Sequence, residues 1–234
     1  MGNFKGKRIV ITGASRGVGY EAAKLFLEQG AEVFGTARDP ERLQKTALEL
    51  GALGAFIPFA ADLCDPAAPK RVADAVSRQW AAIDLLVNNA AVQNWRKDWM
   101  AEGPDLLAKD MQLNVFAPHA LTFHLLPLLR NGDDPRVINV SSGAGIRQGL
   151  MDTPDMPTYR LTKYALNGLT MLWAGELKGE VAVNSLDPGW LKTDLGGPHA
   201  PGEPIDGGRR VLALAGMPSA VTGKFYFGDT ELPF

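Results

Sequence analysis

The 234-residue sequence has few of the residues that would form disulfides or bind a metal, and it has only a small net charge. It contains one cysteine, Cys64, which excludes an internal disulfide framework and is typical of a reducing compartment. Its 24 Lys and Arg residues nearly balance 26 Asp and Glu residues, so the net charge of −2 creates no field that would attract nucleic acid. The 3 histidines form no ligand pattern with the cysteine or with acidic clusters. We therefore expect neither a nucleic-acid partner nor a metal.

Long apolar runs are also missing. The N-terminal segment holds only a short apolar run, which Thr12 ends, so no signal peptide is predicted. The most apolar later segment, residues 121–129, contains His124 and Pro127 and is far shorter than the roughly 20 residues that span a bilayer. We expect a globular, cytoplasmic protein without a membrane partner.

Seven short apolar runs alternate with longer amphipathic segments. The runs are Arg8–Thr12, Glu32–Thr36, Ala55–Ala60, Ile83–Asn88, Arg136–Val140, Val181–Leu186 and Lys224–Gly228. They are continuously apolar and rich in β-branched residues, as strands covered on both faces are. The amphipathic segments are Tyr20–Gln29, Pro40–Leu50, Ala67–Trp80, Pro104–Leu129 and Tyr159–Lys178. The alternation predicts an α/β protein with a doubly wound parallel sheet and helices on both faces, in one domain over residues 1–234.

A glycine-rich turn follows the first predicted strand. It reads Thr12-Gly13-Ala14-Ser15-Arg16-Gly17-Val18-Gly19, and a helix is predicted directly after it. Glycine permits positive φ, close approach of the backbone to a phosphate, and tight packing of a helix on a strand. The helix N-terminus then presents unpaired N–H groups to an anion. The alternative is a tight turn without a ligand, but the first turn of a βαβ unit favours nucleotide binding.

The end of the second predicted strand indicates which dinucleotide is bound. A carboxylate there binds the ribose 2′-hydroxyl of NAD, whereas an arginine accommodates the 2′-phosphate of NADP. Here Arg38 follows the strand, and Arg16 lies in the glycine turn. Two cations directed at one phosphate predict NADP(H). The alternative for Arg38 is a solvated charge paired with Asp39 or Glu41.

Tyr159 and Lys163 are four residues apart and therefore share one face of a helix. A phenol with a pKa near 10 moves protons at neutral pH only when its anion is stabilised, and a nearby ammonium group does this. Ser141 and Ser142 end the fifth predicted strand, at the edge where parallel sheets place active sites. A serine hydroxyl there would hydrogen-bond a carbonyl oxygen as charge develops on it. The alternatives are an ordinary helix face and a turn serine.

Taken together, these residues resemble a known family, the short-chain dehydrogenases/reductases. The resemblance covers essentially the whole chain, and its motifs are Thr12-Gly13-x-x-x-Gly17-x-Gly19, Asp62-Leu63, Asn88-Asn89-Ala90, Asn114, Ser142, Tyr159-x-x-x-Lys163, and Pro188-Gly189 with Thr193. It implies a single Rossmann domain with about seven strands. Residues 188–197 and 223–227 are most similar to carbonyl-reductase-like and C-factor-like members, among which carbonyl reduction with NADPH and bacterial signalling both occur.

The resemblance also implies a role for each matched residue. Tyr159 would be the general acid toward a carbonyl, or the base toward an alcohol, and Ser142 would polarise the oxygen. Lys163 would hold the nicotinamide ribose and lower the pKa of Tyr159, and Asn114 would support a water relay. The cofactor-binding residues would be Gly13, Ser15, Arg16, Gly17, Val18, Gly19, Arg38, Asp62, Leu63, Asn89, Tyr159, Lys163, Pro188, Gly189 and Thr193. The expected function is NADP(H)-dependent carbonyl reduction; the alternative is a non-catalytic dinucleotide-binding sensor or signalling protein on the same fold.

The sequence departs from the family pattern between the catalytic serine and tyrosine. The interval from Ser142 to Tyr159 is longer than the dozen or so residues usual in the family, so an insertion is expected within residues 143–158, and Ser141 is a rival for the catalytic serine. Leu161 stands where a small residue is usual.

Aromatic and thioether side chains are candidates for a substrate wall. Trp95 and Trp190 follow predicted strands at the carboxyl edge, and Met151 and Met156 lie in the expected insertion. The alternative is packing and anchoring of loops. We expect a small-molecule carbonyl or alcohol as the substrate, and either a monomer or a homo-oligomer (dimer or tetramer).

Overall fold

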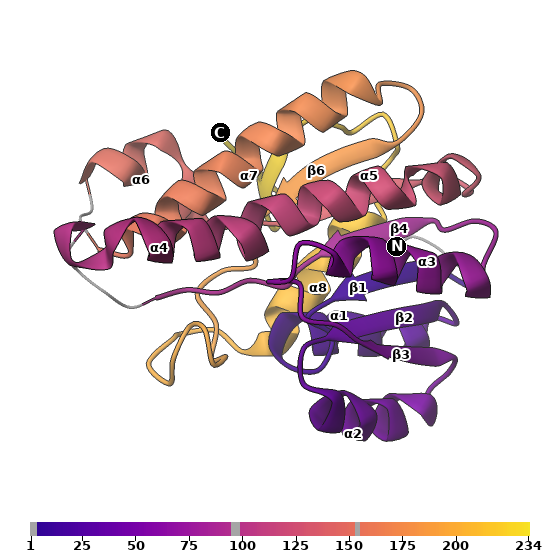
Figure 1. Cartoon of the computed structure of the whole chain (residues 1–234). Coiled ribbons are helices and arrows are strands. Elements are labelled where there is room, and N and C mark those ends of the chain that lie inside the picture. The colour runs from indigo at the N-terminus through magenta and orange to yellow at the C-terminus, as the bar shows by residue number, and fades with distance from the viewer. Residues whose placement is uncertain (1–3, 95–98, 153–154) are drawn as a thin grey trace.

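The computed structural model contains one eight-stranded sheet with helices on both faces (Figure 1). It describes residues 4–94, 99–152 and 155–234. The strand order is β3-β2-β1-β4-β5-β6-β7-β8, and each neighbouring pair is parallel except β7 and β8. The prediction of a doubly wound Rossmann fold is confirmed.

The strands closely match the predicted runs, with one addition. They are β1 Arg8–Thr12, β2 Glu32–Ala37, β3 Phe56–Ala60, β4 Leu85–Asn88, β5 Arg136–Val140, β6 Ala182–Leu186, β7 Phe225–Phe227 and β8 Thr230–Leu232. The addition is β8, a three-residue strand that pairs antiparallel with β7. Its residues are too few and too polar to produce an apolar run, so the sequence pattern did not indicate it.

The prediction that every strand is covered on both faces is wrong for β3. This strand pairs with β2 at the edge of the sheet, and Pro58 and Ala60 are exposed. A proline lacks the N–H that a central strand would need, and edge strands tolerate that loss.

The helices form two layers. They are α1 Gly17–Glu28, α2 Pro40–Gly51, α3 Ala68–Gln79, α4 Trp99–Met111, α5 Ala117–Arg130, α6 Arg147–Asp152, α7 Pro157–Glu176 and α8 Pro204–Ala215, with a π-helical turn η1 Gln112–Phe116 and a 3-10 turn η2 Gly143–Gly145. One buried core unites α3, α5 and α7, including Val76, Leu121 and Ala174. The other unites α1 and α8, including Phe26 and Leu214.

The single helix predicted over residues 104–129 is instead interrupted. The π-helical turn η1 separates α4 from α5, and the N–H of Ala117 donates to the carbonyl of Gln112, five residues back. Pro118 supplies a physical reason, because it has no N–H to donate to the carbonyl of Asn114. Asn114 thus lies at a local change of helix geometry, a feature often found at functional sites.

Candidate active site

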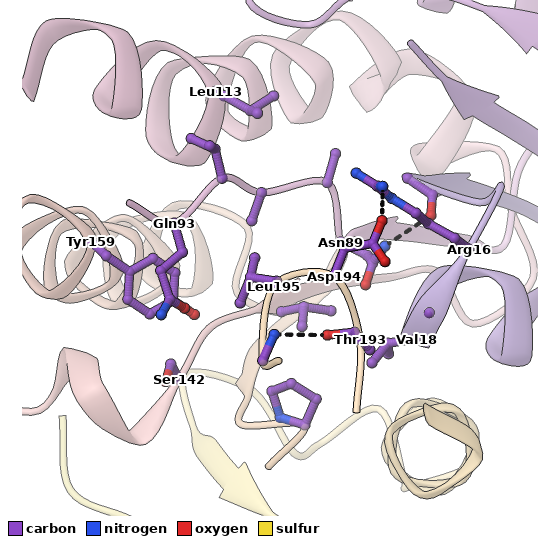
Figure 2. A pocket seen from close by; sticks show the side chains of 18 of the residues that line it. Arg16, Val18, Asn89, Gln93, Leu113, Ser142, Tyr159, Thr193, Asp194 and Leu195 are labelled. Carbon is purple, nitrogen blue, oxygen red and sulfur yellow. Dashed lines mark hydrogen bonds and ion pairs between the residues drawn. The ribbon is translucent and has the colours of Figure 1, made fainter. Parts of the chain in front are cut away.

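A cavity of about 740 Å³ opens along the carboxyl edge of the sheet, where the strand order reverses between β1 and β4 (Figure 2). This is the place where open α/β sheets bind ligands. Most of the residues predicted from the sequence line it: Gly13, Ser15, Arg16, Gly17, Val18, Arg38, Asp62, Leu63, Asn89, Ser142, Tyr159, Lys163, Pro188, Gly189, Trp190 and Thr193. Gly19, Asn114 and Met151 are not part of this lining, and Trp95 lies outside the described residues.

The glycine turn needs glycine for the reasons that the sequence pattern suggested. Gly13 and Gly17 have φ values of +68° and +56°, which side chains rarely adopt. A Cβ atom on Gly19 would lie 2.4 Å from the carbonyl oxygen of Gly13 and 2.5 Å from Nδ2 of Asn89. Gly19 therefore acts through packing: it lets α1 begin close against the end of β1, which leaves backbone as the floor of the cavity.

Hydrogen bonds of Asn89 connect the end of β4 to the glycine turn. Its Nδ2 donates to the carbonyl oxygen of Thr12 at 2.8 Å, and its backbone N–H donates to Oγ1 of Thr12 at 2.9 Å. Ala90 N–H donates to the same hydroxyl oxygen at 2.9 Å. These bonds fix the floor of the cavity at the crossover between β1 and β4.

Three arginines, Arg16, Arg38 and Arg42, line one end of the cavity. Asp39 caps α2 by accepting from the N–H groups of Glu41 and Arg42, both at 3.1 Å. Among the described residues no ion pair joins Arg38 to Asp39 or Glu41, so its side chain is not held by the partners that the alternative interpretation required. Sequence reasoning missed Arg42, although its place in the first turn of a helix capped by Asp39 was a usable signal.

The loop between β6 and α8 reaches across to these arginines. Asp194 forms an ion pair with Arg16, and its Oδ2 lies 3.7 Å from Nη1 of Arg42 (Figure 2). The three side chains are about half exposed, at 55%, 48% and 64% for Arg16, Arg42 and Asp194. Charges at this exposure are strongly screened, so each contact contributes little stability by itself.

At the other end, Tyr159 and Lys163 are buried one turn apart on α7. Nζ of Lys163 donates to the carbonyl oxygen of Val140 at 2.7 Å and lies 5.6 Å from the centre of the Tyr159 ring. Ser142 lies close enough to the hydroxyl of Tyr159 to lower its pKa. The half-buried Ser142, two residues after β5, and the buried Tyr159 and Lys163 of α7 thus lie at the same end of the cavity, as the sequence pattern suggested.

Burial dominates the titration of both α7 groups. The pKa of Tyr159 is raised to about 12, mainly by burial; the interaction with Ser142 opposes this rise, and nearby Asp187 contributes to it. Burial also lowers the pKa of Lys163 to about 7, against the attraction of Asp187. Removal from water penalises the charged form of each group, so the net shift of the Tyr159 pKa is upward. The expected lowering of this pKa by Lys163 stays a prediction.

The two candidate serines are distinguished by their contacts. Ser142 faces Tyr159, and its Oγ accepts from Ala144 N–H at 3.1 Å. Ser141 is buried, and its Oγ donates to the carbonyl oxygen of Lys163 at 3.3 Å. The geometry favours Ser142 over Ser141.

Asp187, at the end of β6, was not recognised from the sequence. Its Oδ2 accepts from Gly143 N–H at 2.9 Å, and its Oδ1 accepts from Gly189 N–H at 2.8 Å. One carboxylate thus joins the loop that follows Ser142 to the loop that contains Pro188. Its position directly before Pro188-Gly189, at the end of a predicted strand, was the available signal.

Asn114 lies outside the cavity lining, and its side chain links three segments by hydrogen bonds. It accepts from Val92 N–H and donates to the Val92 carbonyl, both at 2.9 Å, and its Nδ2 lies 3.0 Å from Oγ1 of Thr162. These bonds join η1, the segment after β4, and α7. The water relay expected at Asn114 stays a prediction.

The predicted substrate wall is only partly placed at the cavity. Trp190 lines it, with Nε1 donating to the carbonyl of Gly196 at 2.7 Å, and Met156 lines it at the start of α7. Met151 does not: its side chain is 74% exposed on α6, the short helix into which the expected insertion folds. Gln93 and Leu195 also line the cavity and were missed, because neither belongs to a motif.

The sequence of residues 7–203 matches a family model described as short chain dehydrogenase. The chain belongs to this family. As a short-chain dehydrogenase it is an oxidoreductase, and the family assignment made from its motifs is confirmed.

The chain is also similar to individual members of the family, in sequence and in structure. A rhamnolipids biosynthesis 3-oxoacyl-[acyl-carrier-protein] reductase from Pseudomonas aeruginosa is 39% identical, over 80% of this chain and 73% of the relative. Carbonyl reductase [NADPH] 1 from Sus scrofa is 28% identical, over 92% of this chain and 88% of the relative. The solved structure of a Pseudomonas aeruginosa RhlG/NADP active-site complex superimposes with a TM-score of 0.88 at 32% identity, covering 97% of each chain.

Within residues 4–94, 99–152 and 155–234 of this short-chain dehydrogenase, no group of three or more His, Cys, Asp or Glu side chains could hold a metal ion. In the same residues, no helix combines the length and the apolar character needed to span a membrane.

Proposed function

We propose that this short-chain dehydrogenase is an NADP(H)-dependent carbonyl reductase, which transfers hydride between the nicotinamide and a carbonyl or secondary alcohol. The observation that supports it most strongly is the meeting of Ser142, Tyr159 and Lys163 at one end of a cavity whose other end has a dinucleotide cradle. Short-chain dehydrogenases of similar structure are described as NADP or NADPH complexes, which supports the same cofactor here.

The cavity fits NADP(H) on its own geometry. At the first βα turn, Gly13 and Gly17 have no side chains that would cover the backbone. A Cβ on Gly17 would lie 3.1 Å from Cγ2 of Thr193. Arg16, Arg38 and Arg42 would hold the 2′-phosphate at the arginine end. Lys163, Pro188, Gly189 and Thr193 would hold the nicotinamide ribose and carboxamide at the catalytic end.

NADP(H) supplies the hydride when bound. Tyr159 donates its phenolic proton to the oxygen of the substrate carbonyl, and Ser142 donates a hydrogen bond to that oxygen as negative charge develops on it. A phenol of ordinary pKa near 10 is protonated at neutral pH, and the raised pKa of Tyr159 leaves it in that proton-donating form. Lys163 positions the ribose and the phenol.

The alternative function, a non-catalytic dinucleotide-binding sensor or signalling protein, is less well supported. A pure binder has no use for a buried tyrosine that lines the cavity beside a serine and a lysine.

Turnover measurements test the proposal. NADPH and NADH oxidation would be followed with aldehydes, ketones, keto esters and quinones, in the wild type and in Tyr159→Phe. We expect NADPH-dependent turnover that falls by about 1,000-fold in Tyr159→Phe, within the range for loss of a general acid. The control is Tyr164→Phe, which changes a tyrosine of the same helix outside the cavity lining. Full turnover in Tyr159→Phe would contradict the mechanism, and tight NADPH binding without turnover of any substrate would favour the sensor.

Oligomeric state and cytoplasmic location stay predictions. Phe116, Phe123, Met171 and Leu172 present exposed apolar side chains on η1, α5 and α7. Size-exclusion chromatography with light scattering would distinguish a monomer from a dimer or tetramer.

A further inference from the structure

Asp187 lines the cavity, and the proposed mechanism gives it no role. It directly follows β6, and its N–H donates to the carbonyl of Tyr226 on β7 at 2.8 Å, so its backbone is held at the edge of the sheet. From this fixed point its Oδ2 accepts from Gly143 N–H at 2.9 Å, and its Oδ1 accepts from Gly189 N–H at 2.8 Å. Both oxygens bind backbone groups, so the carboxylate lies between two loops of the cavity.

The first of these loops carries Ser142. The N–H of Ala144 donates to Oγ of Ser142 at 3.1 Å. Because the hydroxyl oxygen accepts this bond, its own proton is available for a substrate oxygen. A Cβ on Gly143 would lie 2.9 Å from Oδ2 of Asp187, so a side chain there would push the carboxylate away. The direction of the Ser142 hydroxyl therefore depends on a turn that Asp187 holds in place.

The second loop begins with Pro188 and Gly189, which line the cavity where the nicotinamide is proposed to bind. Gly189 has a φ of +90°, and a Cβ on it would lie 2.7 Å from Nη1 of Arg210 on α8. The same Nη1 donates to the carbonyl of Pro188, and the guanidinium carbon lies 4.4 Å from the centre of the Phe227 ring. This turn is thus held by Asp187 on one side and by Arg210 on the other.

Tyr159 is positioned by a different carboxylate. Oγ1 of Thr158, in the first turn of α7, donates to Asp110 at 2.8 Å. Asp110 is fully buried and also accepts from Nδ2 of Asn94, at 2.9 and 3.0 Å. The start of α7 is therefore anchored independently of Asp187. A change at Asp187 would move Ser142 relative to Tyr159 rather than move both together.

The charge of Asp187 also acts on both buried groups of α7. Burial is the larger influence on each; beside it, the carboxylate raises the pKa of Tyr159 and the pKa of Lys163, because it favours the protonated form of both. Further charged or titratable residues lie on the elements packed around it: Arg160 of α7, Arg210 of α8 and Tyr226 of β7. Of these, Arg160 lowers the pKa of Tyr159.

We propose that Asp187 is a positioning residue for proton transfer, whose carboxylate fixes the hydroxyl of Ser142 relative to Tyr159 and to the loop beside the nicotinamide. In this scheme Asp187 touches neither the substrate nor the reacting atoms. A carboxylate satisfies both backbone N–H groups, whereas the single acceptor oxygen of an asparagine would satisfy one. The proposal rests on the proposed carbonyl reduction at Tyr159 and adds a residue on which its geometry depends.

Two variants test the proposal. Asp187→Asn keeps the shape of the side chain and removes its charge and one acceptor, while Asp187→Glu keeps the charge and displaces it. The assay uses NADPH with benzaldehyde, or whichever carbonyl of the turnover panel is reduced fastest. We expect kcat to fall by about 10- to 100-fold in both variants, since a small misplacement of a catalytic group has effects of this size, and KM for NADPH to change less than about threefold. Asp229→Asn, at an exposed aspartate between β7 and β8, is the control.

The pH profile distinguishes positioning of the catalytic groups from a merely structural role. In the reductive direction the mechanism uses Tyr159 with its proton and Lys163 as an ammonium group. Without the carboxylate both pKa values fall, so the alkaline decline of kcat/KM should begin at lower pH in Asp187→Asn than in the wild type. In Asp187→Glu, which keeps the charge, the decline should stay near its wild-type pH. A structural role alone would lower the rate by the same factor at every pH.

The outcomes separate this role from the function on which it rests. An unchanged kcat in Asp187→Asn, or an equal loss at every pH, would overturn the positioning role while carbonyl reduction stands. Loss of NADPH binding, measured by fluorescence titration, would also overturn it, because Asp187 would then hold the cofactor site as a whole. A wild-type enzyme that reduces no carbonyl would overturn the proposed function and the positioning role together.

Discussion

At the arginine end of the cavity, Arg16, Arg42 and Asp194 are about half exposed and interact through charge, whereas at the catalytic end Tyr159 and Lys163 are at most 6% exposed and are held by neutral acceptors. Exposed charges are screened and exchange partners easily, which suits recognition of a charged ligand that must enter and leave. Buried groups have fixed geometry and strongly shifted pKa values, which suits proton transfer. Substitutions should therefore have large effects on turnover at the buried end and smaller effects on affinity at the exposed end.

The largest effect is expected from Lys163→Met. The substitution removes a buried ammonium and leaves the Val140 carbonyl without its donor. We expect kcat/KM with NADPH to fall by about 100- to 1,000-fold, within the range for groups that take part in proton transfer. The measurement is steady-state kinetics, with Lys178→Met as a control at an exposed lysine just beyond α7. Retention of more than a tenth of the activity would contradict a catalytic role for Lys163.

A smaller effect is expected from Arg38→Ala at the exposed end. Loss of a charge-assisted contact to a phosphate should lower the ratio of kcat/KM for NADPH over NADH by about tenfold. The loss should appear mainly in the KM for NADPH, since NADH lacks the 2′-phosphate. Arg209→Ala removes an arginine of α8 whose side chain is 69% exposed, and serves as the control. An unchanged ratio would mean that Arg38 does not contact the phosphate.

The smallest effect is expected from Asp194→Asn. Its carboxylate occupies Arg16 and approaches Arg42, two cations proposed to hold the 2′-phosphate. Removing this negative charge should tighten NADPH binding by about two- to fivefold and NADH binding by less, with the difference shrinking at high salt. Titration of the two cofactors at two ionic strengths would measure this. Weaker NADPH binding would show instead that the ion pair holds the loop over the cofactor.

The same contrast explains how much could be read from the sequence. The glycine turn, the Tyr159–Lys163 pair and the strand that ends just before Ser141 and Ser142 were predicted, because each depends on residues that are near neighbours in the chain. The ion pair between Arg16 and Asp194 joins residues 178 positions apart, and no local pattern marks it. The direction of the Tyr159 pKa shift was also missed, because burial comes from packing that spacing does not reveal.

Details of the helices were missed for a related reason. The amphipathic pattern over residues 104–129 indicated helix correctly, but periodicity does not distinguish an α-helical turn from the π-helical turn at Gln112–Phe116. The double hydrogen bonding of Asp187 could not be foreseen either, since its two donors, Gly143 and Gly189, are backbone groups of different loops.

The buried carboxylate of Asp110 has a consequence for protein engineering. It accepts hydrogen bonds from Asn94, in the segment after β4, and from Thr158, in the first turn of α7, so a single side chain links the two segments behind the cavity. Enzyme designers usually widen a pocket by trimming the residues that touch the ligand, and they then lose contacts. Here the link between the two segments can be changed from a position outside the cavity lining, so Asp110 is a site from which substrate scope can be altered without removing a catalytic group.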